Sequence, residues 1–220
     1  MNKVFKFGED VPGYDIPVLN EREIRAAAGI LFLGMFICLV LVLDHNNFVP
    51  IKFFITGFLT DFIIRIFISP RYSPTLIIGR LIVRNQTSQY VGAAQKKFAW
   101  IIGLVLSSLM FTMFIIINAF GPPTGITCLI CLIFTFFETA FGICLGCKVY
   151  SLVYRKKAQY CPGEVCDVKS RQDIQKTSGV QLLIVLGFVA YIYLLIHLFG
   201  DRFGKKPHDL FGMFETEQVK

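Results

Sequence analysis

The sequence predicts an all-α fold, a polytopic membrane helical bundle with four core spans, an added fifth span and one interfacial amphipathic helix. Hydrophobic residues make up 55% of the 220 positions and charged residues only 17%, whereas soluble domains carry about 25% charged residues. The hydrophobic residues also gather into runs close to the roughly 20 residues that cross a bilayer as a helix. The lipid bilayer is therefore the expected surroundings of this chain.

The net charge of +7 does not indicate nucleic-acid binding. The basic residues lie beside the hydrophobic runs, where they act as topology signals. We therefore expect no nucleic-acid partner.

The chain is expected to open with a polar, extended tail over residues 1–19, which contains Pro12 and Pro17. Asn20 is of a type that caps helix N-termini well. It precedes an apolar run that predicts the first span, over residues 21–43.

The second predicted span, over about residues 50–68, carries Asp61 and Arg65 inside its apolar run. Four residues apart, these side chains share one helical face and can pair. A charge at membrane depth costs roughly 2.5–3.5 kcal/mol on insertion scales. We therefore expect both to face the bundle, with Arg65 extending to the interface as the alternative.

Two Ser-Pro steps within residues 69–74 end this helix, because a residue before proline is pushed into extended geometry. Residues 75–84 then combine apolar side chains with Arg80 and Arg84. This segment is too short to span, so it predicts an interfacial amphipathic helix. A polar loop is expected over residues 85–97.

The third span is predicted over residues 98–120, and the fourth segment stays compatible with one helix from 126 to 154. About 20 of its residues cross the core, so its C-terminal end lies at the far boundary. The predicted units are a polar tail at 1–19, a four-helix membrane domain at 20–155, a cytoplasmic cysteine loop at 156–179, a fifth transmembrane helix at 180–200 and a C-terminal tail at 201–220.

Basic residues in the flanking segments predict the orientation. Four Lys or Arg residues flank the first span on its N-terminal side, five lie in 69–97 and six in 155–179, against one in 44–52 and none in 121–125. The positive-inside rule then predicts a multi-pass cell inner membrane protein with the N-terminus and the cysteine loop cytoplasmic. The C-terminal tail would lie outside, although it carries four basic residues, in mild conflict with the rule.

Three motifs resemble a known family, and together they cover roughly residues 18–155. They are Asp61-x3-Arg65, Pro70-Arg71-Tyr72-Ser73-Pro74 and Glu138-x3-Gly142-x-Cys144-x-Gly146-Cys147-x2-Tyr150. They resemble the bacterial membrane-protein family of unknown function numbered four-three-nine-five. The resemblance implies a four-helix membrane unit of unknown chemistry, which some members join to thioredoxin-like domains. The fifth span and the second cysteine pair look like additions to this pattern.

Cys144 and Cys147 are the candidate catalytic thiols. Their Cys-x-x-Cys spacing suits both disulfide exchange and metal binding, because both side chains share one helical face. At the C-terminal end of a helix, the dipole would oppose thiolate formation. Lys148 would partly compensate for this, and Gly142 and Gly146 could break the helix there. The alternative is that both are small residues that ease helix packing.

Cys161 and Cys166 flank a Pro-Gly turn and form the second candidate pair, which would face a partner protein or a metal. The full order, C-x2-C-x13-C-x4-C, is close to the spacing of a four-thiolate zinc site formed by Cys144, Cys147, Cys161 and Cys166. The rival hypothesis is a dithiol relay from the loop pair to the membrane pair. An inert loop is the third alternative.

Glu138 lies near the middle of the predicted fourth span. A carboxylate at that depth must be neutral or paired. We therefore group Asp61, Arg65 and Glu138 as an intramembrane polar cluster that either pins the bundle or handles protons or anions.

The sequence thus predicts an integral membrane protein that handles thiol redox or sulfur transfer at the cytoplasmic face through cysteine pairs. Its expected partner is a thioredoxin-like protein or another membrane or cytoplasmic protein. Two other functions stay open: a non-enzymatic accessory subunit of a larger membrane complex, and a transporter of small solutes or sulfur anions with Arg65 as the anion site.

Overall fold

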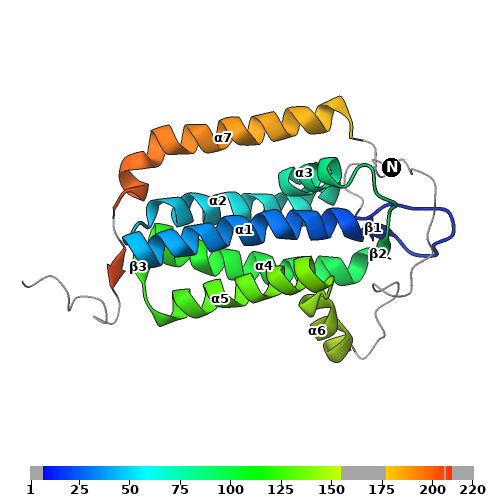
Figure 1. The fold of residues 1–220 in the computed structure, drawn as a ribbon, viewed down its shortest axis with the longest axis horizontal. Coiled ribbons are helices and arrows are strands. Elements are labelled where there is room, and N and C mark those ends of the chain that lie inside the picture. Colours follow the sequence, from blue (N-terminus) through cyan, green and yellow to red (C-terminus); the bar gives the residue numbers. More distant parts are fainter. Residues whose placement is uncertain (1–6, 155–176, 206, 210–220) are drawn as a thin grey trace, which may run out of the picture.

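The computed structural model describes residues 7–154, 177–205 and 207–209. Long helices lie side by side along the longest axis of the molecule, and shorter helices and two-stranded sheets lie toward its ends (Figure 1). The long helices are α1 (Glu21–His45), α2 (Val49–Ile63), α4 (Ala93–Phe111), α5 (Pro122–Phe136) and α7 (Gly179–Phe203). The π-helical segments η2 (Ile64–Ile68), η4 (Thr112–Ile116) and η5 (Phe137–Phe141) extend α2, α4 and α5. The short elements are η3 (Pro70–Tyr72), α3 (Pro74–Ile82), α6 (Leu145–Tyr154), β1 (Val18–Asn20), β2 (Tyr90–Gly92), β3 (Ala119–Phe120) and β4 (His208–Asp209).

Among the described residues, four helical segments are long and apolar enough to cross a membrane. They are Glu21–His45, Ala93–Ile116, Pro122–Phe141 and Gly179–Phe203. The predicted helical membrane class is therefore confirmed. The second predicted span corresponds to α2 with η2, which carries three charged residues, Lys52, Asp61 and Arg65.

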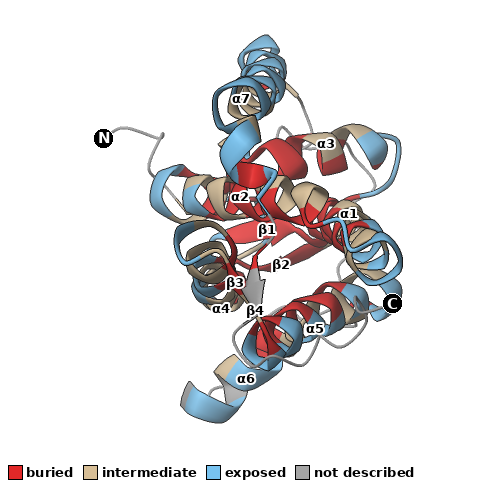
Figure 2. Cartoon of the chain, turned by 90° about the vertical axis from the view of Figure 1, so that its left-hand side faces the viewer, coloured by how far each residue is buried: buried red, intermediate tan, exposed pale blue. Residues whose placement is uncertain are grey.

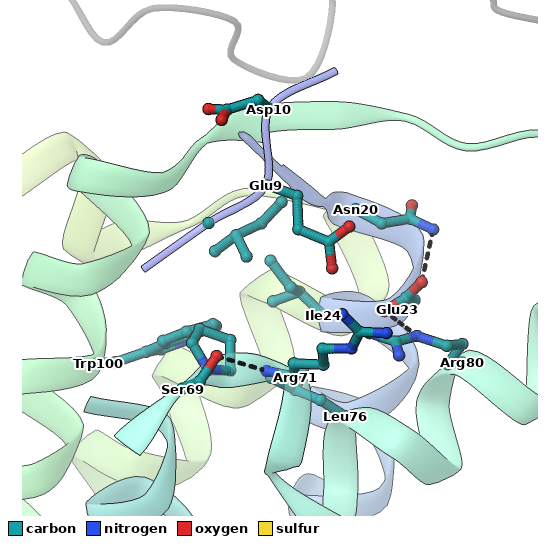
Figure 3. Close-up of a pocket in the computed structure, with 13 residues that line it drawn as sticks. Glu9, Asp10, Asn20, Glu23, Ile24, Ser69, Arg71, Leu76, Arg80 and Trp100 are labelled. Carbon is teal, nitrogen blue, oxygen red and sulfur yellow. Dashed lines mark hydrogen bonds and ion pairs between the residues drawn. The ribbon is translucent and has the colours of Figure 1, made fainter. Parts of the chain in front are cut away.

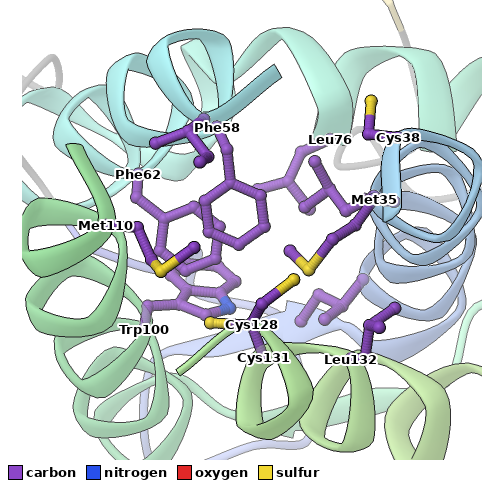
Figure 4. Packing of buried hydrophobic residues seen from close by; sticks show 14 of the residues in the cluster. Met35, Cys38, Phe58, Phe62, Leu76, Trp100, Met110, Cys128, Cys131 and Leu132 are labelled. Carbon is purple, nitrogen blue, oxygen red and sulfur yellow. The ribbon is translucent and has the colours of Figure 1, made fainter. Parts of the chain in front are cut away.

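The core of the bundle lies between α1, α2, α4 and α5. Figure 4 shows Met35, Met110, Cys128 and Cys131 gathered around the rings of Phe58, Phe62 and Trp100. The thiols of Cys128 and Cys131 are buried there as small hydrophobic groups. Seen end-on, the inward faces of these helices are buried and their outward faces are exposed (Figure 2).

The N-terminal segment closes one end of the bundle. β1 pairs antiparallel with β2, with Leu19 opposite Val91, and Glu9 bridges to Val18. The Tyr14 and Tyr90 rings pack edge to face at 5.1 Å. The predicted extended tail is therefore held against the bundle from residue 7 onward, and part of the predicted polar loop at 85–97 is a strand.

α7 runs the full length of the bundle, and β4 after it pairs in parallel with β3 at the opposite end from β1 and β2 (Figure 1). The helix α7 packs on α2 and α3 and lies at the edge of the bundle (Figure 2). None of its most apolar 18-residue stretch is buried. The Gln181 side chain ties its start to η3 by donating to the Arg71 carbonyl at 3.0 Å.

The prediction of one continuous helix over 126–154 is wrong. Gly142 has φ +66°, in the left-handed region that favours glycine, and it ends η5. α6 then starts as a separate helix at Leu145 and leaves the bundle axis (Figure 1). The third span also begins earlier than predicted, at Ala93 rather than 98, which moves Lys96 from the predicted loop into a helix.

Candidate functional site

Cys144 caps the N-terminus of α6. Its carbonyl accepts the first helical hydrogen bond, from the Lys148 N–H at 3.2 Å. Its Sγ accepts a second hydrogen bond, from the Cys147 N–H at 3.3 Å. This is the geometry in which a Ser or Asp side chain caps a helix, with sulfur in place of oxygen.

The thiol pair therefore lies at the start of a helix, and the prediction that it lies at a C-terminal end is wrong. The cause is the helix break at Gly142, a position that was expected to lie inside a continuous helix. The helix dipole therefore acts on the pair in the direction opposite to the expected one, because the N-terminal end of a helix dipole favours negative charge. Reactive cysteines commonly occur at helix N-termini.

The two thiols are not equivalent. Cys147 is buried, with 5% exposure, whereas Cys144 is half-buried. A side-chain hydrogen bond with Cys144, followed by burial, raises the pKa of the Cys147 thiol well above its usual range. Cys144 is thus the more accessible of the two residues, and the raised pKa favours the protonated form of the Cys147 thiol.

A buried lysine lies beside the pair. Lys96 is fully buried, and its Nζ lies 2.7 Å from Glu21 Oε2 and 2.6 Å from Glu138 Oε1. It also interacts electrostatically with Cys144 and Cys147. The first turn of α1, the first turn of α4 and η5 therefore meet at one ammonium group next to the two sulfurs. We call Lys96, Glu21 and Glu138 the ion cluster.

Glu138 does not join Asp61 and Arg65 as predicted, because its ion partner is Lys96. Lys96 was not predicted as a buried partner, because residues 85–97 were expected to form a polar loop. The signal that could have revealed it is its place one turn after the start of an apolar helix. Glu21, at the start of the first span, was not predicted as a site residue either, because its ion partner is Lys96.

Two packing contacts hold α6 on α4. A Cβ at Gly146 would lie 2.5 Å from the Ala99 Cβ, so no larger residue fits without movement. The Tyr150 ring meets the Phe98 ring edge to face at 5.5 Å. The guanidinium of Arg25 lies against Gly142 and donates to the Thr139 carbonyl at 3.3 Å. These contacts fix where Cys144 and Cys147 lie.

Asp61 and Arg65 form a separate buried cluster, with Arg65 Nε 2.7 Å from Asp61 Oδ2. Asp61 also accepts hydrogen bonds from the Ser73 hydroxyl at 2.7 Å and from the Thr75 N–H at 3.0 Å. Arg65 donates to the hydroxyls of Ser73 and Thr75 and lies over the Trp100 ring. The cluster therefore joins α2 to the N-terminus of α3, and neither charge is left without partners.

A polar cavity of about 340 Å³ lies at the same end of the molecule (Figure 3). It is walled by Glu9 from the N-terminal segment and by Arg71 and Arg80, among others. Arg80 Nε lies 3.0 Å from Glu23 Oε2, and Asn20 donates to Glu23 Oε1 at 3.0 Å. Because acids and bases are mixed around it, this cavity does not select one sign of charge.

Cys161 and Cys166 lie outside the described residues, so their predicted roles stay predictions. Within the part of the chain that the structure describes, no three His, Cys, Asp or Glu side chains are placed to hold a metal ion. A zinc site with Cys144 and Cys147 would therefore depend on the loop pair.

A family model for a domain of unknown function, DUF4395, matches residues 19–155. The chain belongs to the DUF4395 family. The predicted family is thus confirmed, and the match contains all three motifs but neither the second cysteine pair nor α7. No curated protein and no solved structure matches the chain.

The DUF4395 motifs coincide with the contacts described above. In the third motif, Glu138 binds Lys96, Gly142 breaks the helix, Cys144 caps α6 and Gly146 contacts Ala99. The first two motifs supply Asp61, Arg65 and Ser73 of the separate cluster. The third motif therefore builds the thiol site, and the first two build a structural joint.

Replacing Asp61 with Ala is expected to lower the free energy of unfolding by about 3–5 kcal/mol, because it leaves Arg65 as an unpaired buried charge. Thermal unfolding in a mild detergent measures the effect. The double variant Asp61→Leu, Arg65→Met removes both charges and is expected to recover most of the loss. Unchanged melting of Asp61→Ala would show that the cluster does not hold the bundle.

Alkylation with N-ethylmaleimide at pH 8 is expected to modify Cys144 at least about tenfold faster than Cys147, because thiolates react and the raised pKa keeps Cys147 protonated. The Cys147 rate should stay low up to pH 9, the usual range of thiol pKa values, and rise only beyond it. Mass spectrometry of the peptides reads both sites, with the chain unfolded in dodecyl sulfate as the control. Equal rates in the folded chain would contradict this assignment.

Proposed function

We propose that this protein is a membrane thiol oxidoreductase in which Cys144 and Cys147 cycle between a dithiol and a disulfide. The observation that carries the proposal is the hydrogen bond from the Cys147 N–H to Cys144 Sγ at the start of α6. It holds the two residues at the spacing and the helix end used by dithiol motifs. It also leaves the more accessible sulfur outermost.

The proposed cycle transfers two electrons to a protein disulfide. Cys144, as the thiolate, attacks one partner sulfur and forms a mixed disulfide, and the other partner sulfur leaves as a thiolate. Cys147 then loses its proton and attacks Cys144 Sγ, which forms the Cys144–Cys147 disulfide and releases the second partner sulfur. The two protons from Cys144 and Cys147 end on the two partner thiols.

The ion cluster supports this cycle by holding the site and by accepting a proton. Lys96 interacts electrostatically with both sulfurs and so stabilises negative charge that develops on them. Glu138 is the less buried of the two acids, with 15% of its side chain exposed against 2% for Glu21. Glu138 is therefore the group that we assign to accept the Cys147 proton and pass it outward.

We further propose that the thiol site faces the cytoplasm of a cell inner membrane protein. The site lies at the end of the bundle that also holds the N-terminal segment and α3 (Figure 1), which are the segments rich in Lys and Arg. In this arrangement α2 with η2 is a further span whose charges pair inside the bundle, and α3 lies at the interface. The partner is a thioredoxin-like or similar protein, contacted directly or through Cys161 and Cys166.

The geometry gives the anion-transport alternative little support, because Arg65 already donates to Asp61, Ser73 and Thr75. An accessory-subunit role is the remaining alternative, and α7 supports it as an exposed apolar helix at the bundle edge. That role requires no chemistry at the thiols.

A Cys147→Ser variant is expected to accumulate a mixed disulfide between Cys144 and its protein partner, because the resolving thiol is missing. Non-reducing electrophoresis of membranes, followed by identification of the linked peptides, measures it. Cys144→Ser should trap nothing, and Cys38→Ser, which changes a buried core thiol, is the matched control.

If neither single variant accumulates a mixed disulfide with a partner protein, the oxidoreductase proposal is rejected and the accessory-subunit alternative is favoured. A persulfide on Cys144 in the wild-type chain, without a mixed disulfide, would instead assign sulfur transfer to the same residue.

A further inference from the structure

A second cavity lies at the other end of the bundle, far from the thiols along the helices. Its volume is about 560 Å³, and it is bordered by α2, by the end of α4 with η4, and by the C-terminal part of α7. Its lining residues are Lys52, Thr56, Phe111, Phe114, Ile115, Ile116, Asn118, Tyr191, Leu195, Phe199, Arg202, Phe203 and Lys205.

The charged residues that line this cavity are all basic in the part of the chain that the structure describes. Lys52, Arg202 and Lys205 line it, and none of its other described lining residues is acidic. Lys52 is only 1% exposed, and its Nζ donates to Asn118 Oδ1 at 2.7 Å and to the Lys205 carbonyl. No carboxylate pairs with Lys52 among the described residues, in contrast to Lys96 and Arg65. A buried cation without a counter-charge favours an anionic ligand.

Most of the remaining wall is apolar, and part of it is exposed at the surface. Aromatic rings from α4 and α7 line the cavity, and two of its wall residues are exposed, Ile116 by 68% and Phe199 by 40%. The outer surface of α7 is apolar along its length, which suits hydrocarbon surroundings. The cavity therefore joins a cationic end, at the level where the helices stop, to an apolar surface.

We propose that this cavity binds the headgroup of an anionic phospholipid. The phosphate lies among Lys52, Arg202 and Lys205, and the acyl chains leave past Ile116 and Phe199 along α7. Basic pockets between transmembrane helices bind anionic headgroups in this way. The apolar walls favour a lipid over free phosphate, since a small hydrated anion gains nothing from aromatic rings. This proposal is independent of the thiol chemistry.

The test is native mass spectrometry of the full chain in a non-ionic detergent, with dioleoyl phosphatidylglycerol and dioleoyl phosphatidylcholine as probes. Phosphatidylglycerol is expected to be retained more than phosphatidylcholine. The double variant Arg202→Gln, Lys205→Gln should weaken its retention about 25-fold, or about fivefold for each cation removed. Both residues are exposed, so the variant is expected to fold. Arg84→Gln, an exposed arginine at the other end, is the matched charge control and should change nothing.

A second pair of variants tests the cavity itself. Leu195→Trp narrows it without changing charge and should weaken phosphatidylglycerol retention, whereas Leu194→Trp, on the neighbouring exposed position, should not. Equal retention of the two lipids, or full retention by the double variant, would overturn the proposal. Inorganic phosphate that displaced the lipid at equal concentration would also overturn it, because the site would then recognise a free anion.

Discussion

The thiol site depends on the ion pairs that the Lys96 ammonium group forms with two carboxylates. Lys96 is fully buried and binds Glu21 from α1 and Glu138 from η5, so it joins three segments that are distant in sequence. Removing Lys96 would leave the carboxylates of Glu21 and Glu138 side by side without a counter-charge, at a cost of several kcal/mol. The ion pairs therefore hold together the start of α4, the start of α1 and the start of η5. Cys144 and Cys147 interact electrostatically with this ammonium group.

The two ends of the bundle solve the problem of charge in different ways. At the thiol end, Lys96, Arg65 and Arg80 each pair with a carboxylate of the same chain, so each of these buried cations has an internal counter-charge. At the other end, Lys52 has only an amide oxygen and a carbonyl as partners among the described residues. The first arrangement suits a site that must hold two sulfurs in place. The second suits a site that takes its counter-charge from outside.

The sequence was sufficient for the membrane class, the family and the pairing of Asp61 with Arg65, because long apolar runs and an i,i+4 charge pair are local signals. It was insufficient for the partner of Glu138, because an ion pair between Lys96 and Glu138 depends on how distant helices pack. The sequence left a break at Gly142 as one of two possibilities, since glycine within an apolar run is compatible with either a helix or a turn. Only the contact of Arg25 with Gly142 and of Gly146 with Ala99 decides between them. The β1–β2 pair was missed because strands of three residues leave no periodic pattern.

The measurement that tests the thiol site most directly is a redox titration of the purified full chain against glutathione buffers, with each cysteine peptide read by mass spectrometry. The account predicts one transition in which Cys144 and Cys147 form a disulfide with each other. Across this transition, the ratio of disulfide to dithiol should change tenfold for about every 30 mV, as for a two-electron couple. Cys128 and Cys131, buried in the core, should stay reduced throughout. A Cys144–Cys147 dithiol that persists in the most oxidising buffer, or a Cys144 that pairs only with glutathione, would contradict the account.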